Sequence, residues 1–84
     1  MRGRLDIIID ILEVAKDGVN KTSIVYGANL NFRLADKYLA LLLKYGLMEN
    51  RQDKYITTDK GRLILGKAKE ITLQLEAPSR TQLI

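Results

Sequence analysis

Apolar residues recur at helical spacing near the start of the chain, and acidic residues occupy the other sides. The apolar positions are Leu5, Ile8, Leu12 and Ala15. Gly18 follows where a helix often ends on a left-handed residue. The pattern predicts a first helix over residues 4–17.

A short second helix is predicted next. Asn20 or Thr22 can cap its start, because both side chains carry an oxygen that accepts from a free backbone N–H. It runs to about Tyr26, and Gly27 interrupts it. Residues 28–30 then form a tight connection.

A third helix is predicted from Phe32 to Tyr45, with Asn31 as its cap and Gly46 at its end. Its predicted inner face is Leu34, Tyr38, Leu41 and Tyr45, with Leu42 beside them. Its predicted outer face is Arg33, Lys37, Ala40 and Lys44. Two helices joined by a turn with glycine and asparagine form a helix-turn-helix layout.

Two short strands are predicted at residues 47–51 and 54–57, around a turn at Gln52 and Asp53. Thr58 or Asp59 then caps a last helix.

That helix is expected to reach about Ala77, because Pro78 cannot continue it, which leaves residues 78–84 as a frayed tail. The element order predicts an α+β fold, a winged helix-turn-helix domain over residues 4–77. A small α+β domain with no nucleic-acid role is the alternative.

The amino-acid composition excludes several kinds of metal, cofactor and catalytic site. The 84 residues include no cysteine and no histidine, so disulfides and the usual ligands of zinc, haem and iron–sulfur clusters are excluded. The chain also lacks an imidazole base, a thiol nucleophile and any phosphate-binding glycine motif. We therefore expect a protein that is not an enzyme and uses no cofactor, with no small-molecule ligand indicated.

The longest apolar run, residues 39–43, is too short to span a membrane. The charged start does not resemble a signal peptide, so a cytoplasmic protein is expected.

The positive charge is concentrated in the middle of the chain. The net charge is +4 overall, but it is +3 over residues 18–45, +3 over residues 46–69, and −1 in each terminal segment. A basic surface on a helix-turn-helix and its wing favours an anionic partner such as nucleic acid.

Several motifs carry a family resemblance. They are Tyr26-Gly27-Ala28-Asn29-Leu30-Asn31-Phe32, Tyr38-Leu39, Gly46-Leu47-Met48-Glu49 and Lys54-Tyr55-Ile56-Thr57-Thr58-Asp59-Lys60-Gly61. The segment at residues 26–32 resembles small archaeal winged-helix DNA-binding proteins of the 10a chromatin type and related predicted transcriptional regulators. The resemblance implies binding of double-stranded DNA as a homodimer, through antiparallel pairing of the long last helix. The last helix of this chain is shorter than an extended coiled coil would need.

The expected DNA-contacting residues are polar or basic and lie on the second helix, the third helix and the wing. They are Lys21, Thr22, Ser23, Asn31, Arg33, Lys37, Lys44, Arg51, Gln52 and Lys54. Arg33 and Lys37 are expected to reach base edges, whereas Asn31 either caps its helix or pairs with adenine. The others suit phosphates, and the part of Lys60 and Arg62 is left open.

The four tyrosines, Tyr26, Tyr38, Tyr45 and Tyr55, are expected to pack in the core rather than to stack on single-stranded bases.

A second apolar stripe lies on the last helix. It consists of Ile64, Ala68, Ile71 and Leu75. Residues 63–67 can dock on the first helix and the wing, whereas residues 68–77 extend past a winged core and are expected to form a homodimer interface. The alternative is that this helix folds back on its own domain.

The sequence thus predicts a transcriptional regulator or small chromatin protein, associated with the nucleoid, that reads the major groove. Two alternatives stay open: a winged domain that docks on proteins without binding DNA, and one that binds RNA.

Overall fold

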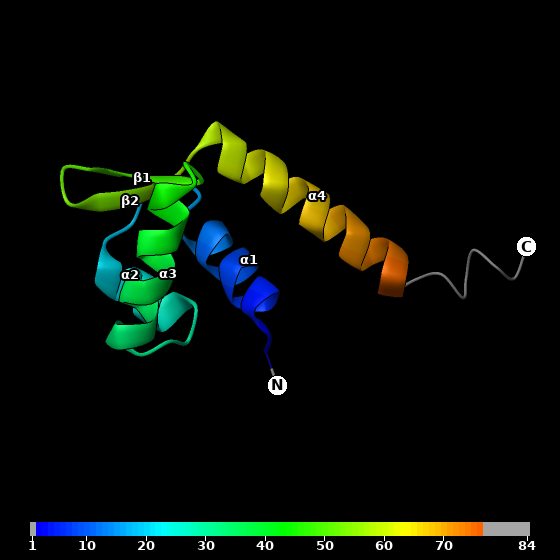
Figure 1. Cartoon of the computed structure of the whole chain (residues 1–84), viewed down its shortest axis with the longest axis horizontal. Coiled ribbons are helices and arrows are strands. Elements are labelled where there is room, and N and C mark those ends of the chain that lie inside the picture. Colours follow the sequence, from blue (N-terminus) through cyan, green and yellow to red (C-terminus); the bar gives the residue numbers. More distant parts are fainter. Residues whose placement is uncertain (1, 77–84) are drawn as a thin grey trace, which may run out of the picture.

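Helices α1, α2 and α3 pack around one core, and a hairpin connects them to a long helix α4 (Figure 1). The computed structural model describes residues 2–76. The elements are α1 (Arg4–Val14), α2 (Lys21–Gly27), α3 (Phe32–Lys44), β1 (Met48–Arg51), β2 (Lys54–Thr57) and α4 (Asp59–Glu76). The predicted end of the last helix at Ala77 and the predicted tail, residues 78–84, lie outside the described residues.

Side-chain caps begin three of the helices. The side-chain oxygen of Asn20 accepts from the backbone N–H of Ser23 at 2.8 Å, and that of Asn31 accepts from Leu34 at 2.7 Å. The Thr58 hydroxyl accepts from the backbone N–H of Gly61 at 3.1 Å. Asn31 is confirmed as a cap, and of the paired alternatives the structure selects Asn20 and Thr58.

The first helix ends three residues earlier than predicted. Gly18 has φ +92° and turns the chain in the left-handed region, as its position indicated. Val19 then exchanges two backbone hydrogen bonds with Tyr55, at 2.9 and 2.7 Å. The chain leaves α1 early because Val19 pairs with the hairpin.

The core lies where α1, α2 and α3 meet the hairpin and the start of α4. Its buried members are Ile7, Ile11, Leu12, Ala15, Ile24, Ala28, Tyr38, Leu39, Leu42, Met48 and Leu65. Helix α3 buries Ala35, Tyr38, Leu39 and Leu42.

The predicted inner face of α3 was therefore partly wrong. Leu41 is 40% exposed and Tyr45 is 55% exposed. The apolar run at residues 39–43 offers several possible stripes, and packing against α1 and α2 selects the one through Leu39 and Leu42.

Core packing is confirmed for Tyr38 and for Tyr55, which packs against the core. It was wrong for Tyr45 and for Tyr26, which is 76% exposed. Tyr26 points away because α2 buries the adjacent residues Ile24 and Val25.

The hairpin is antiparallel, with Met48 opposite Thr57 and Arg51 opposite Lys54. Gln52 and Asp53 form its tip, at φ +50° and +66°. Two positive φ angles are typical of the turn that matches the twist of a two-residue hairpin.

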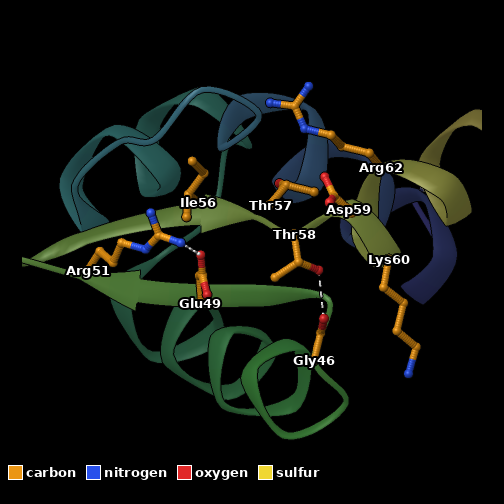
Figure 2. Close-up of a pocket in the computed structure, with 9 residues that line it drawn as sticks. All are labelled: Gly46, Glu49, Arg51, Ile56, Thr57, Thr58, Asp59, Lys60 and Arg62. Carbon is orange, nitrogen blue, oxygen red and sulfur yellow. Dashed lines mark hydrogen bonds and ion pairs between the residues drawn. The ribbon is translucent and has the colours of Figure 1, made fainter.

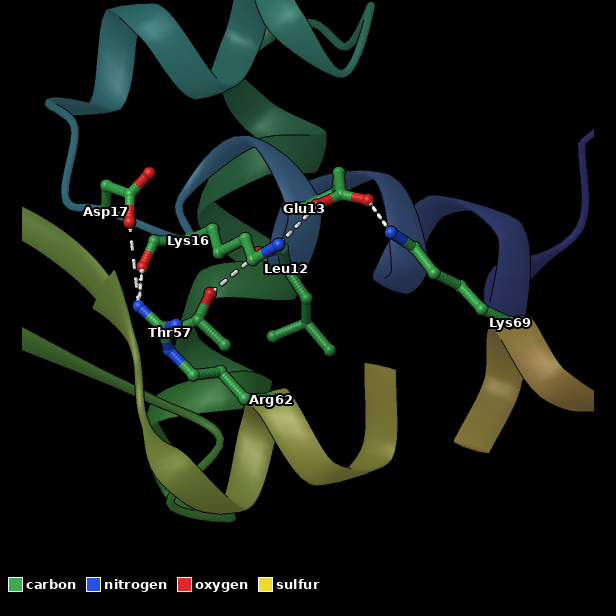
Figure 3. Close-up of polar contacts among 7 residues, drawn as sticks. All are labelled: Leu12, Glu13, Lys16, Asp17, Thr57, Arg62 and Lys69. Carbon is green, nitrogen blue, oxygen red and sulfur yellow. Dashed lines mark hydrogen bonds and ion pairs between the residues drawn. The ribbon is translucent and has the colours of Figure 1, made fainter. Parts of the chain in front are cut away.

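Polar contacts hold α1 against β2 and α4 (Figure 3). The buried Thr57 hydroxyl donates to the backbone carbonyl of Leu12 at 2.8 Å. Lys69 of α4 pairs with Glu13, and this hydrogen bond lowers the pKa of the Glu13 carboxyl.

The start of α4 docks through Gly61 and Leu65, which are both buried, whereas Leu63 is exposed. Lys69, one turn further along, still pairs with Glu13 of α1, and beyond it α4 extends past the other helices (Figure 1). Within residues 2–76, no helix is both long enough and apolar enough to cross a membrane.

Candidate nucleic-acid interface

The predicted outer face of α3 is exposed. Arg33, Lys37, Ala40 and Lys44 all lie at the surface. Within the described part of the chain, neither Arg33 nor Lys37 has a salt-bridge partner. Both therefore offer an uncompensated positive charge to solvent.

These two cations share a surface hollow at the start of α3. It has a volume of about 290 Å³ and is lined by Asn31, Arg33, Leu34 and Lys37. No carboxylate lines it, so an anionic group meets no like charge from a lining side chain there.

Lys21 is the first residue of α2, as predicted, and takes part in an ion pair with α3. Its ammonium group pairs with the Asp36 carboxylate at 2.7 Å. The hydrogen bond to Asp36 raises the pKa of Lys21, so the lysine stays protonated. Because this pair offsets two charges, the positive charge of residues 18–45 resides on Arg33, Lys37 and Lys44.

The remaining polar candidates on α2 and α3 are exposed but partly engaged. Thr22 and Ser23 lie in the first turn of α2. The Asn31 oxygen is used as a cap, so only its amide nitrogen remains to donate to a ligand. Simultaneous pairing of both Asn31 groups with adenine is incompatible with that cap. Lys44 lies over the ring of Tyr45, 5.7 Å from its centroid.

The wing carries a second hollow, of about 510 Å³ (Figure 2). Arg51 lies on its border and pairs with Glu49 at 2.5 Å. Gln52 and Lys54 are exposed at the wing tip, and within residues 2–76 Lys54 has no salt-bridge partner. Lys54 is thus the wing cation with an uncompensated charge.

Lys60 and Arg62, whose part the sequence left open, bind backbone carbonyls. Lys60 donates to the carbonyl of Tyr45 at 3.0 Å, and Arg62 donates to that of Lys16 at 2.7 Å. Arg62 also lies 3.6 Å from Asp17. Both side chains help to fix α4 on the domain, because they satisfy carbonyls at the ends of α3 and α1.

Sequence reasoning missed Arg2, which binds the turn between α2 and α3. The net charge of the first seventeen residues is −1, because Arg2 and Arg4 were counted together with the acidic residues of α1, so this count gave no sign of a basic N-terminal group. Among the described residues, no group of three or more acidic side chains is placed to hold a metal ion.

Comparison with known proteins places the chain in a family. The family profile for the winged helix-turn-helix matches residues 1–76. The uncharacterised protein MJ0287 of Methanocaldococcus jannaschii is 31% identical over 71 residues, which cover 83% of this chain and 73% of that protein. A second protein of that organism, MJ0290, is 34% identical over 71 residues but is matched over only 34% of its length.

A solved structure is also similar. Sso10a-2, a DNA-binding protein from Sulfolobus solfataricus, superposes with a TM-score of 0.78 at 31% sequence identity, covering 96% of this chain and 90% of that chain. The expected resemblance to small archaeal winged-helix proteins is confirmed, and the family is a binding fold rather than an enzyme class. This chain, whose residues 2–76 form four helices and a two-stranded wing, belongs to the winged helix-turn-helix family.

Proposed function

We propose that this protein binds double-stranded DNA, with α3 in the major groove and the wing along the phosphate backbone. Its role is that of a transcriptional regulator or a small chromatin protein. The similarity to Sso10a-2, a DNA-binding protein, supports this proposal.

One observation carries the proposal. Arg33 and Lys37 lie in the first two turns of α3, exposed and without a carboxylate partner in residues 2–76. In a helix-turn-helix these positions of the recognition helix reach base edges. A solvated surface helix has no need to leave both cations unpaired while the nearby Asp36 pairs with Lys21.

We propose individual roles from the chemistry and position of each side chain. Arg33 suits a bidentate hydrogen bond to guanine, with Lys37 beside it. Lys44 and Lys54 suit phosphates, as do the hydroxyls of Thr22 and Ser23. The proposed site also includes Lys21, Asn31, Arg51 and Gln52. The charges of Lys21 and Arg51 are partly compensated, because they form ion pairs with Asp36 and Glu49.

We also propose that the protein is a homodimer that pairs through α4. Ile71 and Leu75 are 57% and 73% exposed, and Ile64 is also at the surface. Together with the half-buried Ala68, these residues repeat along one side of the helix. An apolar stripe on a helix that extends past the domain is best covered by the same stripe of a second copy.

Salt dependence tests the DNA proposal. If about four to six phosphates are neutralised per protomer, the logarithm of the binding constant should fall with the logarithm of salt concentration at a slope of about −4 to −5 for each protomer in the bound species. Fluorescence anisotropy with a labelled random duplex measures this slope. A nearly flat titration would reject DNA binding through a cationic surface and favour the protein-docking alternative.

A substitution tests the recognition helix. Arg33→Ala should cost about 1–3 kcal/mol at a selected site and relax base preference there. Lys67→Ala is a matched control, because Lys67 is exposed on α4 and has no salt-bridge partner within residues 2–76. Equal effects of the two substitutions would remove Arg33 from the site. Competition with double-stranded RNA separates the RNA-binding alternative.

A further inference from the structure

Arg2 fixes the start of the chain to the helix-turn-helix. Its guanidinium donates to the backbone carbonyls of Ala28 and Asn29, at 2.5 and 2.8 Å, and to the Asp10 carboxylate at 2.8 Å. The two carbonyls lie in the turn between α2 and α3, where helical hydrogen bonding has ended. Arg2 therefore joins α1 to that turn, with its own charge compensated by Asp10.

The next residues are held as well. The Asp6 carboxylate accepts from the backbone N–H of Gly3 at 3.0 Å, which fixes the entry into α1. Arg4 is the first residue of α1. Its backbone is held in position by the Arg2 contacts before it and by the hydrogen bond between Gly3 and Asp6 around it. Its own side chain is exposed and has no salt-bridge partner within residues 2–76.

Arg4 lies beside Lys37 of α3. These two cations line a hollow of about 210 Å³, whose other lining residues are Tyr38 and Leu41. Lys37 also lines the neighbouring hollow with Arg33. The two hollows therefore adjoin at Lys37. Together they form a basic surface that runs from Arg33 on α3, past Lys37, to Arg4 on α1.

No carboxylate lines either hollow. Two like charges that share a hollow repel each other, and an anion placed between them removes that repulsion. The acidic side chains of this region are engaged elsewhere, since Asp10 binds Arg2 and Asp36 binds Lys21. A bound anion would therefore be the compensating charge for cations that no carboxylate lining these hollows offsets.

We propose that Arg4 binds a phosphate of the DNA backbone next to the groove that α3 enters, and that Arg2 is the positioning residue that holds it there. This inference rests on the proposed function. Arg4 suits a phosphate rather than a base, because α1 flanks the recognition helix instead of entering the groove with it. Arg2 uses three of its five N–H donors within the chain, and Asp10 compensates its charge, so we assign it the positioning role rather than a DNA contact.

The test compares salt slopes of duplex binding for the full chain and its variants, with folding checked by circular dichroism. For each bound protomer, Arg4→Ala should make the slope shallower by about 0.9 and weaken binding about eightfold at about 0.1 M salt. The control Lys67→Ala should leave the slope unchanged. If the wild type binds no duplex, the proposed function fails; if it binds and Arg4→Ala keeps the wild-type slope, only the role of Arg4 is overturned.

A double variant tests the positioning role. Arg2→Gln should remove part or all of what Arg4 contributes to the salt slope. The double variant Arg2→Gln with Arg4→Ala should have the same salt slope as Arg4→Ala alone. A further decrease in the double variant would show that Arg2 binds a phosphate directly and would overturn its positioning role.

The source of the phosphate is tested by replacing chloride with inorganic phosphate at constant sodium concentration and pH. This exchange should leave the affinity of the wild type for DNA unchanged. If phosphate lowers the affinity of the wild type for DNA but not that of Arg4→Ala, the hollow binds a free phosphate ion instead of DNA.

Discussion

Gly61 is the tightest point in the docking of α4, and replacing it with alanine should destabilise the protein. A Cβ atom at this position would lie 2.2 Å from the backbone carbonyl oxygen of Leu47 and 2.7 Å from the Cγ2 atom of Thr57. Neither distance is compatible with van der Waals contact. The carbonyl belongs to the backbone that leads into β1, so it cannot rotate away as a flexible side chain can.

The magnitude combines two opposing effects. Alanine in a helix is favoured over glycine by about 0.5–1 kcal/mol. Overpacking a tight site typically costs about 1–3 kcal/mol, and a fixed carbonyl places Gly61 at the upper end of that range. The net loss should be about 2 kcal/mol, which corresponds to a decrease in Tm of about 8–16 °C for a domain of this size.

Gly66 provides a matched control in the same helix. A Cβ atom there meets nothing within 4 Å, so Gly66→Ala should stabilise the protein by about 0.5–1 kcal/mol. Urea unfolding followed by circular dichroism, at one protein concentration, measures both changes. If the two substitutions shift stability in the same direction, close backbone packing at Gly61 is not what restricts that position.

Three further predictions concern contacts around α1 and α4. Thr57→Val should cost about 1–3 kcal/mol, because the buried carbonyl of Leu12 loses its donor; urea unfolding equal to that of the wild type would contradict this. Since Lys69 lowers the pKa of Glu13 in the folded state, their pairing contributes stability above the unfolded pKa of that carboxyl and loses it as the pH falls through the folded pKa. The two side chains are 49% and 40% exposed, so the acid-dependent loss should be below about 1 kcal/mol, and it should become smaller in Lys69→Met, where only the weaker effect of Lys16 remains, in acid titrations of stability. Ile71→Glu should dissociate the proposed dimer, and sedimentation of the wild type as a 9.5 kDa particle would refute pairing through α4.

Several elements were predictable because local interactions fix them. The caps at Asn20 and Asn31 act within three residues, and Gly18 adopts the left-handed conformation its position requires. The exposed stripe through Arg33 and Lys37 follows from the 3.6-residue period of one helix. The proposed contact residues on α3 could therefore be placed on one face without coordinates.

Other features depended on partners far along the chain. The buried stripe of α3 runs through Leu39 rather than Leu41, because α1 and α2 cover that side. Lys21 is paired with Asp36 of the next helix, which no spacing rule within α2 reveals. The role of Arg2 was missed because its acceptors at Ala28 and Asn29 are 26 and 27 residues away.

The sequence by itself determined the helices, the wing and the cationic side of α3, since capping, turn chemistry and helical periodicity act over a few neighbouring residues. Only the tertiary structure decided which charges remain uncompensated and which apolar side chains remain exposed. Those outcomes depend on packing between segments such as Arg62 and Lys16, which are 46 residues apart. A local pattern can place a side chain on a face, but the rest of the fold determines what covers it.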